Sequence, residues 1–215
     1  MKVSYQMKAL LIATTLVLLA TPAAAQVGEN RDGLLNANLA TAEELGALPQ
    51  LNDAAVDAIV AGRPFLRMAD VHAVVSKHVA SGDLEALYRK FWLPINLNDV
   101  TEAEVKLIPG VGDRMAHEFE EYAPYKALPV FHREIAKYVD DAELARLAQY
   151  VFVPLDLNTA SEAQFKTIPG VGGRMAHEFE EYRPWKAEAQ FQREIGKYVD
   201  EDEVARLWRY VKIGK

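Results

Sequence analysis

The chain has 215 residues, a formal net charge of −7 and no cysteine. Without cysteine it has no disulfide framework, no thiolate nucleophile and no cysteine-ligated metal site. Its acidic balance excludes a protein that coats nucleic acid by bulk electrostatic attraction, so any nucleic-acid binding has to come from local geometry.

Residues 1–25 have the pattern of a cleavable secretory signal. Lys2 and Lys8 form a positive n-region, Ala9–Ala20 is an apolar stretch, and Ala23–Ala25 precede Gln26 as an A-x-A cleavage site. The apolar stretch is short for a membrane span. We therefore expect a periplasmic or secreted chain with no membrane span after cleavage; an uncleaved N-terminal anchor is the alternative.

Residues 26–35 are short and polar, with Gly28 and Gly33, and are expected to be a flexible lead-in. Removal of the signal takes away two lysines and no acid, so the formal net charge changes from −7 to −9.

The remainder consists of three 60-residue repeats. Residues 96–155 (repeat 2) and 156–215 (repeat 3) align without gaps with 36 identities in 60 positions, and the same offset reaches back to 36–95 (repeat 1). Asparagines, prolines and aromatics stay in register: Asn38, Asn98 and Asn158; Pro49, Pro109 and Pro169; Pro64, Pro124 and Pro184; Phe65, Tyr125 and Trp185. Such self-similarity predicts a tandem array of one supersecondary unit.

Each repeat predicts two short helices joined by a tight turn. The first helix opens at a capping box, namely Thr41-x-x-Glu44, Thr101-x-x-Glu104 or Ser161-x-x-Gln164. In repeat 2 it is expected to end at Ile108-Pro109, since a residue before proline avoids helical geometry. A turn of two glycines follows, and then a second helix with Met115, Ala116 and Phe119 on one face, stopped by Pro124.

The second half of each repeat predicts another pair of helices. In repeat 2, Phe131 and Ile135 belong to one short helix, a turn surrounds Val139, and Leu144, Leu147 and Val151 follow on the next helix. No run of alternating strand character is long enough to predict a strand. We therefore expect an all-α fold with helices of roughly 8–12 residues.

A helix, a Pro-Gly-apolar-Gly turn and a second helix resemble the helix-hairpin-helix motif. The 60-residue length and the opening Leu157-Asn158-Thr159-Ala160-Ser161-Glu162 are similar to the DNA-binding domain of the competence protein ComEA and its exported relatives. The resemblance covers residues 36–215 in three copies. It implies three tandem units, each a double helix-hairpin-helix with a degenerate second hairpin. Fold relatives such as the PsbU subunit of photosystem II bind protein and do not act on DNA.

The glycine turns of repeats 2 and 3 are candidate phosphate sites. A helix N-terminus offers free N–H groups and a partial positive charge, and glycines before it let an anion come close to the backbone. An arginine two residues beyond the second glycine adds a charged contact. The expected DNA phosphate-binding residues are Gly110, Val111, Gly112 and Arg114 in repeat 2, and Gly170, Val171, Gly172, Gly173 and Arg174 in repeat 3. We expect Val111 and Val171 to turn inward and hold the loop to the core, so that both are buried, as are Ile108 and Ile168. The competing interpretation is that Pro-Gly-Val-Gly only makes a sharp turn between packed helices.

The three turns are not equivalent. Repeat 1 has Leu48-Pro49-Gln50-Leu51-Asn52 and Ala54 in place of the arginine, so this hairpin is expected only to pack. Repeat 2 has Asp113, which suits the helix dipole but repels a phosphate. Repeat 3 has Gly173 there, and its charge is milder, with 10 basic and 11 acidic residues against 6 and 11 in repeat 2. Repeat 3 is therefore the better candidate.

Other motifs favour structural roles. In the second hairpins, Asp140 and Asp200 stand where an anion would need amides, and we expect them to cap helices. His117 and Glu121, like His177 and Glu181, are expected to be exposed pairs and not metal ligands. The rings of Phe119, Phe131, Phe179 and Phe191 are assigned to the core, and Tyr125 and Trp185 are expected to pack under the next helix, with stacking on a base as the alternative.

No catalytic constellation and no nucleotide loop is recognisable, so we expect no enzyme, no cofactor and no metal. Two functions remain in competition. One is a periplasmic module that binds double-stranded DNA without sequence preference, with a role in DNA uptake. The other is a cell-envelope interaction or scaffold protein that has kept the fold and lost DNA binding, which the net charge of −9 favours.

Overall fold

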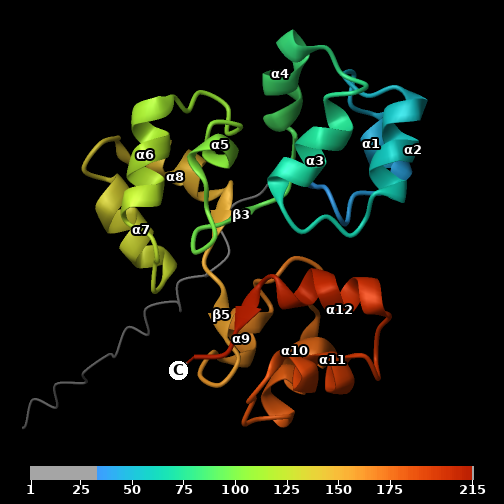
Figure 1. Cartoon of the computed structure of the whole chain (residues 1–215), viewed down its shortest axis with the longest axis vertical. Coiled ribbons are helices and arrows are strands. Elements are labelled where there is room, and N and C mark those ends of the chain that lie inside the picture. Colours follow the sequence, from blue (N-terminus) through green and yellow to red (C-terminus); the bar gives the residue numbers. More distant parts are fainter. Residues whose placement is uncertain (1–32, 215) are drawn as a thin grey trace, which may run out of the picture.

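The computed structural model describes residues 33–214, so the expected signal (1–25) and most of the expected lead-in (26–35) lie outside the described residues. The described part is mostly helical, with strands of only two residues, which confirms the predicted predominance of helix. Three groups of consecutive helices are distinguishable in Figure 1, one for each repeat.

The helices follow the repeats. Repeat 1 contains α1 (Ala42–Gly46), α2 (Asp53–Ala61), α3 (Met68–Val75), the 3-10 turn η1 (Ser81–Asp83) and α4 (Leu84–Tyr88). Repeat 2 contains α5 (Glu102–Val105), α6 (Asp113–Glu121), α7 (Leu128–Ile135) and α8 (Asp141–Ala148). Repeat 3 contains α9 (Glu162–Phe165), α10 (Gly173–Glu181), α11 (Glu188–Ile195) and α12 (Glu201–Trp208).

Short parallel strand pairs, which the sequence did not predict, close each group of helices. They are β1 (Leu35–Asn36) with β2 (Phe91–Trp92), β3 (Ile95–Asn96) with β4 (Val151–Phe152), and β5 (Leu155–Asp156) with β6 (Val211–Lys212). Two residues are too few to show a period of two, so no alternation marks them in the sequence. Each opening strand begins one residue before the expected repeat boundary.

These strands correct two expectations. Leu35, the last residue of the expected lead-in, instead pairs with Phe91, and its N–H donates to the Lys90 carbonyl at 2.8 Å. Val151, expected on a helix, lies in β4 opposite Ile95. The first helices are also shorter than predicted, since α5 and α9 have four residues each and end before the Ile-Pro pair.

The asparagine near the start of each repeat fixes the loop that follows the second helix. Phe65 N donates to Asn38 Oδ1 at 2.8 Å, Tyr125 N to Asn98 Oδ1 at 2.6 Å, and Trp185 N to Asn158 Oδ1 at 2.7 Å. Residues 27 apart are thereby held together in all three repeats. This shared contact explains why the asparagines and the aromatics stay in register.

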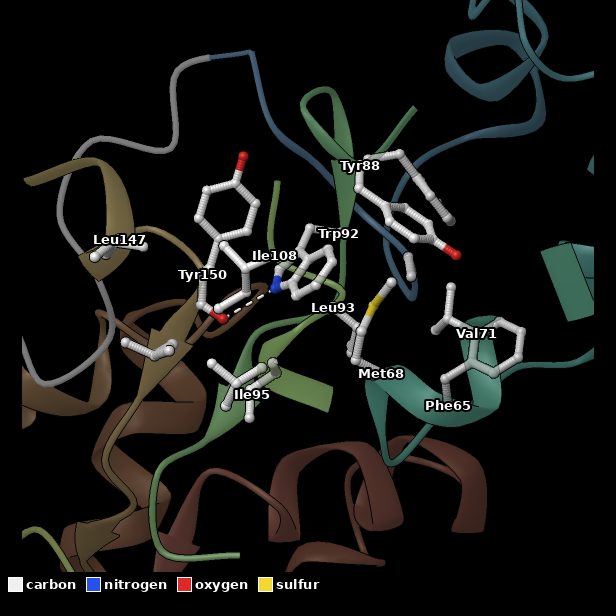
Figure 2. Packing of buried hydrophobic residues seen from close by; sticks show 14 of the residues in the cluster. Phe65, Met68, Val71, Tyr88, Trp92, Leu93, Ile95, Ile108, Leu147 and Tyr150 are labelled. Carbon is white, nitrogen blue, oxygen red and sulfur yellow. Dashed lines mark hydrogen bonds between the residues drawn. The ribbon is translucent and has the colours of Figure 1, made fainter. Parts of the chain in front are cut away.

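Repeats 1 and 2 share a continuous core. Trp92 is 1% exposed, and the centre of its ring lies 5.1 Å from the centre of the Tyr150 ring in an edge-on arrangement. Its Nε1 donates to the Tyr150 carbonyl at 2.9 Å (Figure 2). Arg67 of repeat 1 also forms ion pairs with Asp99 and Glu104 of repeat 2. Glu104 is therefore turned away from a full capping box, although Thr101 still accepts from its N–H at 3.3 Å.

Arg209 ties repeat 3 to the rest of the chain. Its guanidinium donates to the Leu66 carbonyl at 3.1 Å and to the Pro94 carbonyl at 2.7 Å, and lies 5.0 Å from the ring centre of Phe152. Burial lowers the pKa of this arginine. Within residues 33–214, no helix has the length and apolar character needed to cross a membrane.

Candidate functional site: the glycine hairpins

The first glycine of each hairpin shapes the turn. Gly110 and Gly170 have φ of 79° and 80°, in the left-handed region that side chains rarely adopt. A Cβ at Gly170 would also lie 3.0 Å from Arg206 Nη2 and 3.4 Å from the Leu39 side chain. These two glycines are therefore needed for the backbone.

The second glycine has a different role. Gly112 and Gly172 are the N-cap residues of α6 and α10, with ordinary extended φ of −101° and −90°. Both are exposed, and a Cβ at either would meet nothing within 4 Å. No side chain caps either helix. The glycines thus leave the first N–H groups of two nine-residue helices open to solvent, where the helix dipole favours an anion.

The apolar centres of the turns pack on the core to different extents. Ile108 and Ile168 are buried as predicted, and so is Val171, at 8% exposed. Val111 is only partly buried, so its predicted burial is wrong in degree. In both turns the valine N–H donates to the carbonyl of the preceding isoleucine at 3.0 Å, which keeps the turn tight.

Charge differs between the two open helix starts. In repeat 2, Asp113 is exposed at the first turn of α6 and pairs with Lys106 at 3.1 Å, so the lysine is occupied by an internal acid. In repeat 3, Gly173 stands in that place, and a Cβ there would lie 3.5 Å from Lys166 Cε. Lys166 pairs with Glu162 at 2.5 Å. Both lysines are therefore ion-paired, and the two helix starts differ in that the first turn of α10 contains no acid.

Arg114 and Arg174 are exposed and form no ion pair within residues 33–214. Each guanidinium lies over a tyrosine ring of the second hairpin, Arg114 at 5.8 Å from the centre of Tyr138 and Arg174 at 5.5 Å from the centre of Tyr198. The sequence did not indicate this contact, because the partners are 24 residues apart.

In repeat 1 a side chain caps the helix that follows the hairpin turn. Asn52 is the N-cap of α2, and its Oδ1 accepts from Ala55 N at 2.9 Å. The side-chain amide oxygen thus takes up one of the N–H groups at the start of α2. Ala54, at the place of the arginine, supplies no charge. Together these residues agree with the expected packing role of this hairpin.

The second hairpins are closed in the same way. Asp140 caps α8 and accepts from Glu143 N at 2.9 Å, and Asp200 caps α12 and accepts from Glu203 N at 2.9 Å. The prediction that these carboxylates are helix caps is confirmed. Only the first hairpins of repeats 2 and 3 combine a glycine cap with an arginine in the described chain.

Two arginines that sequence reasoning missed lie beside the hairpins, Arg146 on α8 and Arg206 on α12, and Arg206 braces its turn through a hydrogen bond. Arg206 is 3% exposed; its Nη1 donates to the Pro169 carbonyl at 2.7 Å, and its Nε donates to Glu203 at 2.6 Å. Arg146 occupies the same place in repeat 2 and binds Glu143, and a Cβ at Gly110 would lie 3.7 Å from its Nη2. Hydrogen bonds across 37 residues leave no local signal, and only the shared A-R-L triplet of the two repeats points to them.

The remaining candidates keep structural roles. Tyr125 and Trp185 are 1% and 2% exposed and donate to the carbonyls of Phe119 and Phe179, so neither ring is available for stacking on a base. The four phenylalanines assigned to the core are 0% exposed. His117 lies 3.1 Å from Glu102 and 3.8 Å from Glu121. In the described part of the chain, no three His, Asp or Glu side chains are grouped to hold a metal ion.

Comparison with known proteins gives no match: no protein-family model, no curated protein and no solved structure matches this chain.

Proposed function

We propose that the three repeats are tandem helix-hairpin-helix units of the ComEA type, and that the exported chain binds double-stranded DNA without sequence preference. Backbone amides at the starts of α6 and α10 hold phosphates, and Arg114 and Arg174 assist them. The observation that carries the proposal is the pair of exposed, uncapped glycine N-caps, which contrasts with the side-chain caps at α2, α8 and α12.

Physical chemistry supports weak binding through few contacts. An uncapped helix start stabilises an anion by about 0.3–1 kcal/mol, and a charge-assisted hydrogen bond adds about 1.5–3 kcal/mol. We expect each hairpin to hold one or two phosphates, so a chain with a net charge of −9 should bind DNA only locally, at the hairpins, and weakly. Contacts to phosphate carry no base information, which gives binding independent of sequence.

The proposed setting is the periplasm, reached through a cleaved signal, with a role in holding incoming DNA during uptake. The protein acts there as a binding module and not as an enzyme, and it needs no cofactor. Repeat 3 provides the stronger site, because its helix start has Gly173 where repeat 2 has Asp113.

The test is a titration of the mature chain with duplex DNA across a salt series. With two to four phosphates contacted, the logarithm of the binding constant should fall against the logarithm of salt concentration with a slope near −2 to −4, at about −0.9 per phosphate. Duplexes of unrelated sequence should bind alike. A folded chain that ignores duplex DNA even at low salt would overturn the proposal.

Gly172→Asn is the sharpest variant. Gly172 and Asn52 have nearly the same backbone angles, φ −90° and ψ 176° against φ −94° and ψ 171°, so the asparagine cap of repeat 1 can be transferred without strain. The new side chain should cap α10 and compete with phosphate, weakening binding about five- to tenfold without loss of stability. Gly172→Glu should weaken it further by adding a negative charge, and Arg174→Ala should remove the charged contact.

The matched controls lie in repeat 1. Asn52→Asp keeps a helix cap at the position aligned with Gly172 and adds a negative charge there, as Gly172→Glu does. Ala54→Gly changes the residue at the position aligned with Arg174. Neither should alter DNA affinity, because repeat 1 has no open amides. Equal effects in repeats 1 and 3 would mean that general charge, and not the glycine hairpin, governs binding.

The second candidate is an envelope interaction module that does not bind DNA. A groove of about 840 Å³ between α11 and α12 favours it, since Trp208 and Val199 line the groove together with Leu66 of repeat 1, a leucine that is 48% exposed. If duplex DNA does not bind, Leu66→Asp is the variant to compare in pull-downs from an envelope extract.

A further inference from the structure

Repeats 2 and 3 share a side-chain network that joins the first hairpin to the second. In repeat 3, Arg174 lies over the ring of Tyr198 at 5.5 Å, and the Tyr198 hydroxyl lies 2.9 Å from the Tyr182 hydroxyl. Lys197 lies over the other ring, 4.9 Å from the centre of Tyr182. Repeat 2 reproduces these contacts, with Arg114 over Tyr138, Lys137 over Tyr122 and the two hydroxyls 2.9 Å apart.

A buried carboxylate accompanies the two tyrosines. Glu178 is 8% exposed, one turn before Tyr182 on α10, and its Oε2 has no hydrogen-bond partner. The pKa of Tyr198 is raised, first by its hydrogen bond with Tyr182 and then by Glu178. The Tyr198 hydroxyl is held by the Tyr182 hydroxyl 2.9 Å away, and the face of the Tyr198 ring meets Arg174.

Repeat 1 lacks the arginine, the carboxylate and both tyrosines of this network and keeps only the aligned lysine, Lys77. The aligned positions of Arg174, Glu178, Tyr182 and Tyr198 are occupied by Ala54, Ala58, Gly62 and His78. Repeat 1 nevertheless forms the same order of helices and the same parallel strand pair. The network is therefore not required for the fold, and it is present only where the hairpin has its glycines and its arginine.

Tyr198 gives Arg174 a platform that a carboxylate could not give. An ion pair would neutralise the guanidinium, whereas the face of an aromatic ring attracts the cation and leaves its N–H groups free. An arginine held beside open helix amides loses less side-chain freedom when it meets a phosphate than an unsupported arginine does.

We propose that Tyr198 is a positioning residue that holds Arg174 at the open start of α10, and that Tyr138 does the same for Arg114. This inference rests on the proposed DNA binding and assigns a role to the second hairpin. That hairpin binds no phosphate, because Asp200 caps its helix, and instead it supplies the ring that orients the arginine of the first hairpin.

The test is a double-mutant cycle on the mature chain with duplex DNA at low salt. Tyr198→Leu should weaken binding about two- to fivefold, the value of an exposed cation–π contact of about 0.5–1 kcal/mol. The same change in an Arg174→Ala background should have no effect, because the supported group is gone. Tyr198→Phe keeps the ring and should restore near-normal affinity, although it loses the hydroxyl bond and lowers thermal stability.

The control is His78→Leu, the aligned change in repeat 1, which should leave affinity unchanged. Equal affinity of Tyr198→Leu and the unaltered chain would overturn the role of Tyr198, as would the same loss with and without Arg174. In both cases DNA binding itself would stand. An unaltered chain that ignores duplex DNA would overturn the proposed function and this role together, so the two failures are distinguishable.

Discussion

The helix starts of α2 in repeat 1 and α10 in repeat 3 have nearly the same backbone but opposite chemistry. At α2 the Asn52 side chain accepts from Ala55 N, and at α10 Gly172 leaves the equivalent donors to solvent. The turn before each helix is anchored by an apolar residue with the same exposure, Leu51 at 8% and Val171 at 8%. A hairpin can therefore keep its fold and lose its candidate site through a change of cap.

The largest expected effect concerns the shared anchor. Val171→Ala should lower the free energy of unfolding by about 1–3 kcal/mol, and Leu51→Ala should cost at least as much, because both remove buried methyl groups. Val111→Ala should cost less, since Val111 is only partly buried. Urea unfolding followed by circular dichroism measures all three. A change near zero for Val171→Ala would mean that the loop is loose and cannot preorganise its amides.

A smaller effect separates the two glycines of one turn. Gly170→Ala should lower the free energy of unfolding by about 1–2 kcal/mol, because its φ of 80° is costly for an L side chain and Arg206 lies within 3.0 Å of the added Cβ. Gly172→Ala should cost only about 0.5 kcal/mol, since the site is open and the backbone is ordinary. Thermal unfolding of the two variants measures this difference. Equal losses of stability would contradict the separate roles of Gly170 and Gly172.

The Asn52 cap of α2 should contribute about 1 kcal/mol to the free energy of unfolding. Asn52→Ala removes the hydrogen bond to Ala55 N and should destabilise the chain by about that amount, whereas Asn52→Gly should cost a few tenths of a kcal/mol. Gly172→Asn should gain a few tenths, as a cap is added where none exists. Differential scanning calorimetry ranks the three variants. A loss of stability in Gly172→Asn would break the proposed equivalence of the two helix starts.

The smallest effect concerns the exposed His117 of repeat 2. The hydrogen bond with Glu102 raises the pKa of His117, and the charges of Glu102 and Glu121 act in the same direction. The stability from this contact is therefore present below the unfolded-state pKa of about 6.5 and is lost as pH rises through the higher folded value. NMR titration should show that Glu102→Gln lowers the pKa of His117. An unchanged value would mean that the contact does not form in solution.

Much of the helical architecture follows from the sequence because its signals are local. Capping residues such as Thr41 and Ser161 mark helix starts, and Asp140 and Asp200 mark two more, since each bonds an N–H three residues away. The unequal hairpins are also a property of the sequence, because a glycine or an asparagine at the N-cap decides whether amides stay open. Helix lengths are less well determined, as four-residue helices fall below the length at which periodicity is visible.

Contacts between distant residues were decided only by the tertiary structure. The parallel pairing of Leu35 with Phe91, the bond from Arg206 to the Pro169 carbonyl and the position of Arg174 over Tyr198 join residues 24 to 56 positions apart. Such contacts depend on how the helices pack, and neither periodicity nor turn chemistry encodes them. The sequence by itself therefore determined which helix starts are open, and the packing of the helices determined which side chains surround them.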